Sequence, residues 1–572
     1  MNLSVIIPAY NAAETLEETI KSLQAQTLPN WEAIIIDDGS QDETAEIATK
    51  LALEDNRLRV ISQGNGGVCV ARNRGIQEAG FDWLLFLDAD DWISPQYVEK
   101  MTAAIAADPS LDIIHCGWTR VTPDGTLSGE KYVDPVTDLF LQSTRTCPFA
   151  IHACIVHKAL VETAGGFDVT ISTCEEWDLW QRIARTGIRF GAVREVLSFY
   201  RMRPKSLSRD AHQLFTDAMR VVTQGHSADS RVINPDSRYI QGKSPEILPY
   251  IKFSLSSWFA GLFLGEGEDA RPLLNEIRDE IAPDLDPYLI ANNLFESIPL
   301  AICQPLEQWY TLWTKVEKVL QDFLIALESQ SKAFGLANRT RKILEVLILE
   351  KTQVVNPLHI GTTYGVSLEI AEPILDIFPP EKSDRLYCQI TLEGTKLGQL
   401  ELPVIDGKVT AWVLKDAIAA QFAWAILGKF FEHTLYTSEQ VQEHDRNGWT
   451  VFLQQLWGKA DWQGGDFYNP DLSAETSTVK YLDNANPLVI EVSQDLFDVS
   501  VNVPELDVVL TVGGVAVGTI SLPVKENLIT AQALRVALTL ETGFELCRVC
   551  VREVLVGQSL TDSTPLRSRL VR

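Results

Sequence analysis

Short apolar runs alternate with stretches of helical periodicity over about the first 230 residues. The apolar runs lie at 3–7, 33–36, 58–61 and 83–87. Apolar runs of this length predict buried strands, and the pattern between them predicts helices. This alternation is typical of βαβ units around a mostly parallel sheet, so we expect an α/β fold.

The first of these helices carries a start signal. Asn11 has the chemistry of a helix N-cap, and Glu14 follows three residues later, as in a capping box. Leu16, Ile20 and Leu23 then recur at helical spacing. We therefore expect this helix to be capped at Asn11.

Polar residues follow the predicted strands where each one ends. The second strand ends in Asp37-Asp38-Gly39-Ser40, and the fourth runs into Asp88-Ala89-Asp90-Asp91. A glycine-rich turn follows the third strand and leads into a helix over 70–79. Open α/β sheets bind ligands beyond the carboxyl ends of their strands, so these segments predict one polar crevice.

The pattern turns helical from 244 to 350 and then repeats itself. QITLEGTKLGQLELPVIDGKVTA begins at Gln389, and VLTVGGVAVGTISLPVKENLITA begins at Val509. Gly398 matches Gly518 at an offset of 120 residues (518 − 398). Each copy combines alternating strands, glycine turns and a helix, over 417–431 in one and 533–544 in the other. This predicts two duplicated small α+β modules.

A chain of 572 residues is too long for one core. We expect a catalytic domain over 1–235, a helical connector or subdomain over 236–355, and the two modules over 356–475 and 476–572. Neither module contains a cluster of histidine, cysteine and carboxylate residues, so their expected role is accessory, with oligomer formation one option.

The formal net charge of −28 argues against a nucleic-acid partner. An enzyme of this charge needs local cations or a metal ion to bind a doubly negative substrate. Nine scattered cysteines favour a reducing cytoplasm over a disulfide framework. The Cys547-Cys550 pair has no second pair or nearby histidine, so it is weak evidence for zinc or redox chemistry.

The sequence starts without a signal-peptide pattern. Its nearest approach to a membrane span, Phe253 to Leu264, is shorter than the roughly 18 residues that a span needs. We therefore expect a cytoplasmic protein without a transmembrane segment. A peripheral contact with the inner face of the membrane stays open.

Asp88 and Asp90 at the end of an apolar strand suit a hard divalent cation. Mg²⁺ is typically held by one or two carboxylates together with substrate phosphates. Such acidic triplets also occur as solvated turns. The position beside other polar strand ends favours the metal interpretation, with Mn²⁺ or Mg²⁺ as the ion.

Five blocks in order resemble the family 2 glycosyltransferases. They are SVIIPAYNAAETLEETIKSLQAQTLPNWEAIIIDDGSQDET, NGGVCVARNRGIQEAGFDWLLFLDADDWISP, GGFD at Gly165, EEWDLWQRIA at Glu175 and YRMRPKSLS at Tyr200. The resemblance spans most of residues 1–209. It implies the GT-A fold, a Rossmann-like, mostly parallel sheet that binds a nucleotide-diphospho-sugar, and an inverting transfer.

The resemblance also assigns donor-site roles by position. It implies that Tyr10 lies near the base, that Asp38 accepts a hydrogen bond from the pyrimidine, and that Asp90 is the direct metal ligand. Asp37 has the simpler interpretation of a turn residue. The other residues implied at the donor are Pro8, Ala9, Asn11, Arg72, and Asp88 near the ribose or a metal-bound water.

The catalytic base implied by the resemblance is Glu176, the second acid of the pair that begins at Glu175. Many relatives carry aspartate there. A second departure is Arg203, where many relatives carry a histidine. Arginine does not ligate metals but can bond a phosphate in bidentate fashion, so we expect Arg203 at the donor, assisted by Arg201, Lys205 and Ser206. His152 and His157 are given no role, and Asp178 is expected to be a helix-start residue.

These observations predict a metal-assisted glycosyltransferase of the hexosyltransferase type that uses a nucleotide-sugar. The resemblance implies a UDP-linked donor, because such donors are the commonest in the family. The sequence leaves the acceptor open: it can be a saccharide such as a surface polysaccharide, a lipid-linked saccharide, a protein or a small metabolite. One rival is a nucleotidyltransferase, which normally has a GxGxR-type loop where this chain has PAYNAAET. The other is a non-catalytic nucleotide-sugar-binding or scaffold protein that acts through its C-terminal repeats.

Overall fold

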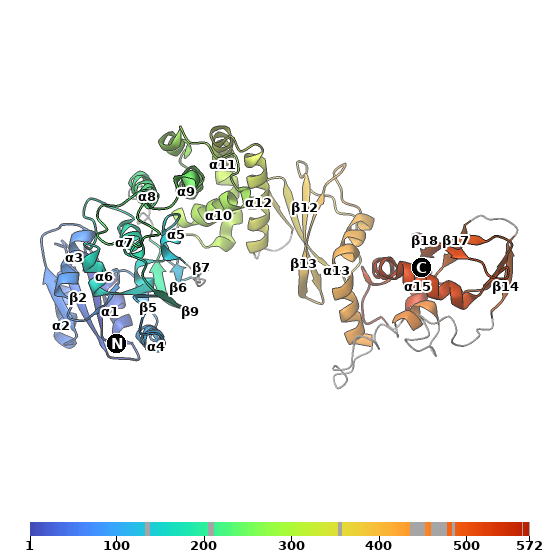
Figure 1. Cartoon of the computed structure of the whole chain (residues 1–572), viewed down its shortest axis with the longest axis horizontal. Helices are drawn as coiled ribbons and strands as arrows, with labels where there is room; N and C mark the ends of the chain where they lie inside the picture. The colour runs from blue at the N-terminus through green and yellow to red at the C-terminus, as the bar shows by residue number, and fades with distance from the viewer. Residues whose placement is uncertain are drawn as a thin grey trace. The chain divides into compact units, whose positions relative to one another are not determined.

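The computed structural model of the chain describes residues 1–131, 138–203, 211–352, 357–434, 452–458, 477–482, 487–562 and 564–570 (Figure 1). The chain divides into two compact units, Met1–Gln353 and Val354–Arg572. Each unit is described by itself below.

A single mixed sheet forms the centre of the first unit. Within the described residues its strands follow the order β3-β2-β1-β4-β8-β6-β9-β5, and β7 pairs with β6. Strands β3, β2, β1 and β4 are parallel neighbours. The strands are β1 (Leu3–Ala9), β2 (Trp31–Asp37), β3 (Leu58–Ser62), β4 (Trp83–Phe86), β5 (Trp92–Ile93), β6 (Ile113–Val121), β7 (Leu127–Lys131), β8 (Cys154–His157) and β9 (Phe190–Arg201).

Helices cover this sheet because its central strands β1, β2 and β4 are buried on both faces. α3 packs against β1 and β2 so closely that a Cβ added at Gly75 would lie 2.3 Å from the Ile6 side chain. Glycine is therefore the residue that fits there. The helices are α1 (Leu16–Gln24), α2 (Thr44–Glu54), α3 (Val68–Glu78), α4 (Tyr97–Ala107), α5 (Leu139–Ser143), α6 (Lys158–Thr163), α7 (Glu175–Ala184) and α8 (Ala211–Gly225).

The predicted strands and the α/β fold class are confirmed, but the predicted cap of the first helix is wrong. α1 begins at Leu16 and is preceded by Thr15. Asn11 has a left-handed backbone, with φ at 50°, and its side chain accepts a hydrogen bond from the Gln41 amide instead. The side chain therefore joins two loops and is not available to cap a helix.

The predicted helical region completes the first unit. Its helices are α9 (Leu248–Gly265), α10 (Pro287–Ala301), α11 (Trp309–Ser331) and α12 (Leu336–Lys351). In the described part of the chain, one segment, Pro245–Gly265, is long and apolar enough to cross a membrane, and 56% of an 18-residue apolar stretch within it is buried inside the fold. A buried core helix of a soluble domain has the same properties, so this segment is weak evidence for a membrane span.

The second unit contains the duplication. β11 pairs in parallel with β12, which forms a hairpin with β13, and β15, β17 and β18 repeat this arrangement. The elements are β10 (Leu358–Ile360), β11 (Thr363–Glu369), β12 (Arg385–Leu392), β13 (Thr395–Pro403), α13 (Ala411–Thr434), β14 (Val479–Leu482), β15 (Leu488–Glu491), β16 (Asp498–Val501), β17 (Glu505–Val512), β18 (Val515–Pro523), β19 (Leu528–Ile529) and α15 (Ala531–Cys550).

The two copies repeat single hydrogen bonds as well as elements. Asp376 accepts from the first amide of α13, and Asp498 accepts from the first amide of α15, both at 2.8 Å. Buried side chains of both copies, from Ile370 to Leu570, form one hydrophobic cluster. The copies therefore share a core. The boundaries expected near 235 and 355 stay predictions, and the one near 475 lies outside the described residues.

Candidate active site

The carboxyl ends of β1, β2 and β4 meet at one edge of the sheet. Ala9 lies opposite Asp37 in the parallel register, and the Asp38 amide donates to the Ala9 carbonyl at 2.9 Å. The Leu87 amide donates to the Ile6 carbonyl, which brings the end of β4 alongside β1. The polar segments that follow these strands therefore lie together, as the sequence predicted.

The end of β1 presents the residues expected at the nucleoside. Ala9 is buried and Pro8 partly buried, whereas Tyr10 leaves 47% of its surface exposed. An exposed aromatic ring at a strand end is suited to stacking on a base. Asn11 joins this segment to the loop after β2, because its amide donates to the Ser40 hydroxyl at 3.0 Å.

Asp38 is fully engaged by the glycine-rich loop that precedes α3. Its carboxylate accepts from the Gln63 side chain at 2.8 Å and from the amides of Gly66 and Gly67 at 2.8 to 3.1 Å. Only 3% of Asp38 is exposed. In this structure Asp38 shapes the loop, and the expected contact with a pyrimidine stays a prediction. Asp37 accepts from the Ser40 amide and is the turn residue that the sequence predicted.

The acidic motif forms a tight turn after β4. The Asp91 amide donates to the Asp88 carbonyl at 3.1 Å. The side chains of Asp88 and Asp90 are about 30% exposed, and burial together with the charge of Asp88 raises the pKa of Asp90. The residue that precedes α1 supports the turn, since the Thr15 hydroxyl donates to the Ala89 carbonyl at 2.9 Å.

Arg72 on α3 links this turn to the segment that carries the expected base. Its Nη2 donates to Asp88 at 2.7 Å and its Nη1 donates to Glu175 at 2.5 Å. Although burial disfavours the charge, Asp88 and Glu175 raise the pKa of this guanidinium. The sequence placed Arg72 near the nucleotide, and the structure places it, 3% exposed, between two carboxylates.

Glu176 lies at the start of α7, directly after Glu175. It is partly buried and makes no ion pair with any described residue. Burial and the neighbouring Glu175 carboxylate raise the pKa of Glu176 to about 8. A carboxylate that is unpaired and more basic than usual is suited to accept a proton.

Asp178, two residues later, is 2% exposed and bonds to Arg182 at 2.8 Å. Its carboxylate is thus occupied by an ion pair, which agrees with the structural role expected for it. The interpretation of Glu176 as the base is compatible with this geometry and stays a prediction.

Arg201, the last residue of β9, and Arg203 lie on the acidic turn. Arg203 approaches Asp90 to 3.3 Å and donates to Thr15 at 2.8 Å. Arg201 donates from Nε to the Asp90 carbonyl at 2.8 Å. These contacts place both cations beside the expected site of the diphosphate. Lys205 and Ser206 lie outside the described residues.

Sequence reasoning missed a buried pair behind the turn. Asp91 and His152 are 2% and 0% exposed in their side chains, and their carboxylate and ring nitrogen lie 3.2 Å apart. Burial and the charges of Asp90 and Asp88 raise the pKa of Asp91, and burial lowers the pKa of His152 to about 4. Asp91 follows the acidic triplet directly, but no sequence signal joined His152 to it.

The donor set fits a divalent cation that is shared with a substrate. In the described ranges no three or more histidine, cysteine, aspartate or glutamate residues are arranged to hold a metal by themselves. Mg²⁺ keeps several non-protein ligands and needs only one or two carboxylates. Asp88 and Asp90 are accessible and close enough to raise the pKa of Asp90, so they meet that requirement.

Comparison with known proteins finds related sequences for the first unit. The family described as "Glycosyl transferase family 2" matches residues 4–161, and "Glycosyl transferase family group 2" matches residues 83–265. The chain is 41% identical to the uncharacterized glycosyltransferase EpsJ of Bacillus subtilis over 122 residues, which are 21% of this chain and 35% of EpsJ. The chain thus spans about a third of the length of this relative.

A second relative is matched over more of its length. The chain is 28% identical over 208 residues to the putative teichuronic acid biosynthesis glycosyltransferase TuaG of Bacillus subtilis, which cover 36% of this chain and 81% of TuaG. Among solved structures, residues 1–349 of S. aureus TarS in complex with UDP-GlcNAc give a TM-score of 0.37 at 18% identity, over 63% of this chain and 95% of that chain.

The family match covers the strand ends, the acidic turn and Arg72, and it leaves the second unit without an assignment. The parallel order of β3, β2, β1 and β4 is the arrangement that the resemblance implied. The N-terminal domain of this chain belongs to the family 2 glycosyltransferases, with the GT-A fold.

Proposed function

We propose that this chain transfers a sugar from a nucleotide-diphosphate donor to an acceptor hydroxyl with inversion. The proposed donor is a UDP-sugar. The observation that carries the proposal is the double ion pair of Arg72 with Asp88 and Glu175. The buried Arg72 guanidinium connects Asp88, one of the two carboxylates suited to a divalent cation, to Glu175, the residue beside the unpaired Glu176. The proposed cation site and the segment that carries the proposed base are thereby linked through one side chain.

In the proposed reaction Glu176 accepts the proton of the acceptor hydroxyl while that oxygen attacks the anomeric carbon. The bond between this carbon and the diphosphate oxygen breaks, and the nucleoside diphosphate leaves with the electron pair. Attack from the face opposite the leaving group inverts the stereochemistry. Arg201 and Arg203 stabilise the charge that develops on the diphosphate, and such stabilisation is often the largest catalytic contribution.

A divalent cation, Mn²⁺ or Mg²⁺, completes the proposed site. Asp90 and Asp88 would hold it, and it would neutralise the leaving diphosphate. Arg203 lies beside Asp90 where many relatives carry a histidine, so it supplies a fixed positive charge to the same diphosphate. The two aspartates remain the residues whose loss removes the cation.

The first experiment is a panel of nucleotide-sugars, tested for binding and for sugar release with Mn²⁺, Mg²⁺ or chelator present. We expect release of one nucleoside diphosphate that depends on the metal and is lost in Asp90→Ala. Asp108→Ala, in an exposed pair with Arg189, is the matched control and should retain full activity. If the folded protein binds no nucleotide-sugar, the proposed function is wrong, and the interpretation as a non-catalytic scaffold protein is favoured.

The pH dependence of kcat/KM should report the ionisation of Glu176. The base must be ionised, and its pKa is raised to about 8, so kcat/KM should rise about tenfold per pH unit below that value and level off above it. The measurement is sugar release from pH 6 to 9.5 at saturating metal. A flat profile across this range would contradict the assignment, as would a profile of the same shape in Glu176→Gln.

We also propose that the protein acts in the cytoplasm. All nine cysteines are free thiols, which suits a reducing cytoplasm. The acceptor, whether saccharide, lipid-linked or protein, and any association through the C-terminal repeats are left to the acceptor search that follows identification of the donor.

A further inference from the structure

The stretch from Asp168 to Asp178 carries the proposed base. Most of it has no regular structure, and α7 begins only at Glu175. Cys174, directly before the helix, has a left-handed backbone with φ at 57°. A non-glycine residue in this conformation is strained, so neighbouring groups must hold it there. The position of Glu176 therefore depends on what fixes this stretch.

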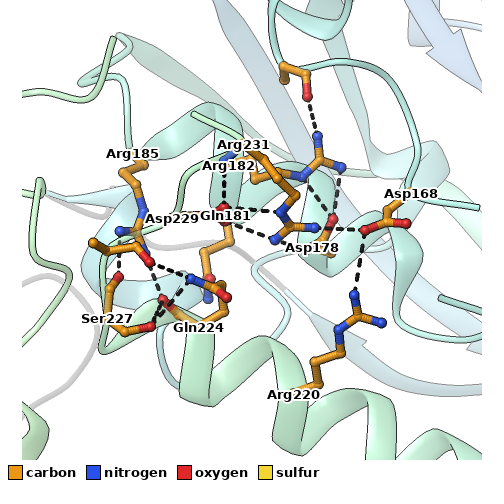
Figure 2. Close-up of polar contacts among 12 residues, drawn as sticks. Asp168, Asp178, Gln181, Arg182, Arg185, Arg220, Gln224, Ser227, Asp229 and Arg231 are labelled. Atoms are coloured by element: carbon orange, nitrogen blue, oxygen red, sulfur yellow. Dashed lines mark hydrogen bonds and ion pairs between the residues drawn. The ribbon is translucent and has the colours of Figure 1, made fainter. Parts of the chain in front are cut away.

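We infer that Arg231 is a positioning residue for Glu176, because it bonds to the chain on both sides of that residue. Its Nη1 donates to Asp168 at 2.9 Å, eight residues before Glu176, and its Nη2 donates to Asp178 at 2.8 Å, two residues after it. Figure 2 shows the guanidinium of Arg231 beside these two carboxylates, to which it is bonded. The inference rests on the proposed function, since it concerns the same base.

Arg231 is itself held in a fixed orientation. Asp229 accepts from its Nε at 3.0 Å and from its Nη2 at 2.8 Å, a bidentate pair that sets the plane of the guanidinium. The side chains of Asp178 and Asp229 are 2% and 3% exposed. Although burial opposes ionisation, the bonds of Arg231 help to hold the pKa of Asp229 below its usual value.

α8 adds a second anchor to the same stretch. Asp217 accepts from the Thr173 amide at 3.1 Å and from the Thr173 hydroxyl at 2.9 Å, directly before Cys174. Arg220, also on α8, donates to Thr170 at 3.2 Å. The chain from 217 to 231 therefore contacts the stretch before, within and after its strained residue.

The shape of the Arg231 side chain suits a positioning role. A planar guanidinium fixes the directions of several carboxylates at once, which a lysine cannot do. Arg231 contacts no expected donor residue, so its loss should leave the nucleotide site intact. The expected signature is a fall in kcat without a change in nucleotide affinity.

The experiment compares Arg231→Lys and Arg231→Gln with the wild-type full chain. The probes are sugar release from the UDP-sugar that the wild type uses, and calorimetric binding of UDP with Mn²⁺. We expect kcat to fall about tenfold in the lysine variant and about 10²-fold in the glutamine variant. The Kd for UDP should stay within about twofold. Arg238→Gln, in an exposed pair with Asp236, is the matched control and should behave as the wild type.

Two further variants test the inference without relying on the folding of the Arg231 variants alone. Asp217→Asn should also lower kcat, and Asp168→Asn should add little to Arg231→Gln, because both remove the same link. Unchanged kcat in the Arg231 variants overturns the inference, and so does an equal loss of kcat and of UDP affinity. If the wild type releases sugar from no donor, the proposed function fails first, and that outcome is visible without any variant.

Discussion

Replacement of Glu176 by glutamine should lower kcat by about 10²–10⁴-fold, the usual contribution of a positioned base. Glutamine keeps the shape of the side chain but cannot accept the proton. Donor binding should be unchanged, because Glu176 is not among the residues expected to contact the nucleotide or the diphosphate. The measurement is single-turnover sugar transfer alongside calorimetric binding of the donor.

The same variant should be more stable than the wild type at neutral pH. The pKa of Glu176 is raised above its unfolded value, so the stability that its protonated form contributes is complete below about pH 4.5 and is lost as pH rises through about 8. Glutamine does not titrate, so its advantage should grow from pH 4 to pH 8. Glu162→Gln, in an exposed pair with Lys158, is the control for both measurements. Near-normal turnover in Glu176→Gln would make the base assignment wrong.

Replacement of Arg72 should damage activity and stability together. Arg72→Met leaves Asp88 and the 8% exposed Glu175 without their shared cation. Removing one partner of a buried ion pair costs about 3–5 kcal/mol, so the free energy of unfolding should fall by about that much. Displacement of the acidic turn and of the segment before α7 should lower kcat by about 10²-fold.

Arg72→Lys separates the two effects. Lysine keeps the charge but presents a point donor, so it can satisfy one carboxylate well and not both. We expect most of the stability to return while kcat stays low. Arg74→Met, on the same helix but in an exposed pair with Glu78, should change neither property. If the lysine variant turned over normally, a link between the two carboxylates would be unnecessary for catalysis.

The parts of the fold that could be predicted depend on local pattern. The run at 33–36 is fully apolar and the run at 3–7 is apolar except for Ser4, and they became the buried strands β1 and β2. Short continuous apolar runs of this kind are typical of strands that are buried on both faces. The duplication was also readable, since matched glycines occupy the same hairpin position in both copies. The cap at Asn11 failed because a partner about 30 residues away, the Gln41 amide, competed for its side chain.

The polar residues at the strand ends could be identified from the sequence, but the contacts between their side chains could not. Asp88, Asp90 and Glu176 stand in recognisable motifs. The pairing of Arg72 with Glu175, the capture of Asp38 by glycine amides and the burial of His152 against Asp91 join residues distant in the chain. Such contacts are set by the packing of α3 against the sheet and by the short 3-10 helix, Ile151–Ala153, that leads into β8, which no local pattern encodes.

The shared core of the second unit has a consequence for the evolution of this chain. Each copy covers apolar surface of the other, from Ile370 to Leu570, so a chain that lost one repeat would expose that surface to water. Selection can therefore remove both repeats or neither, while their outward-facing residues drift apart freely.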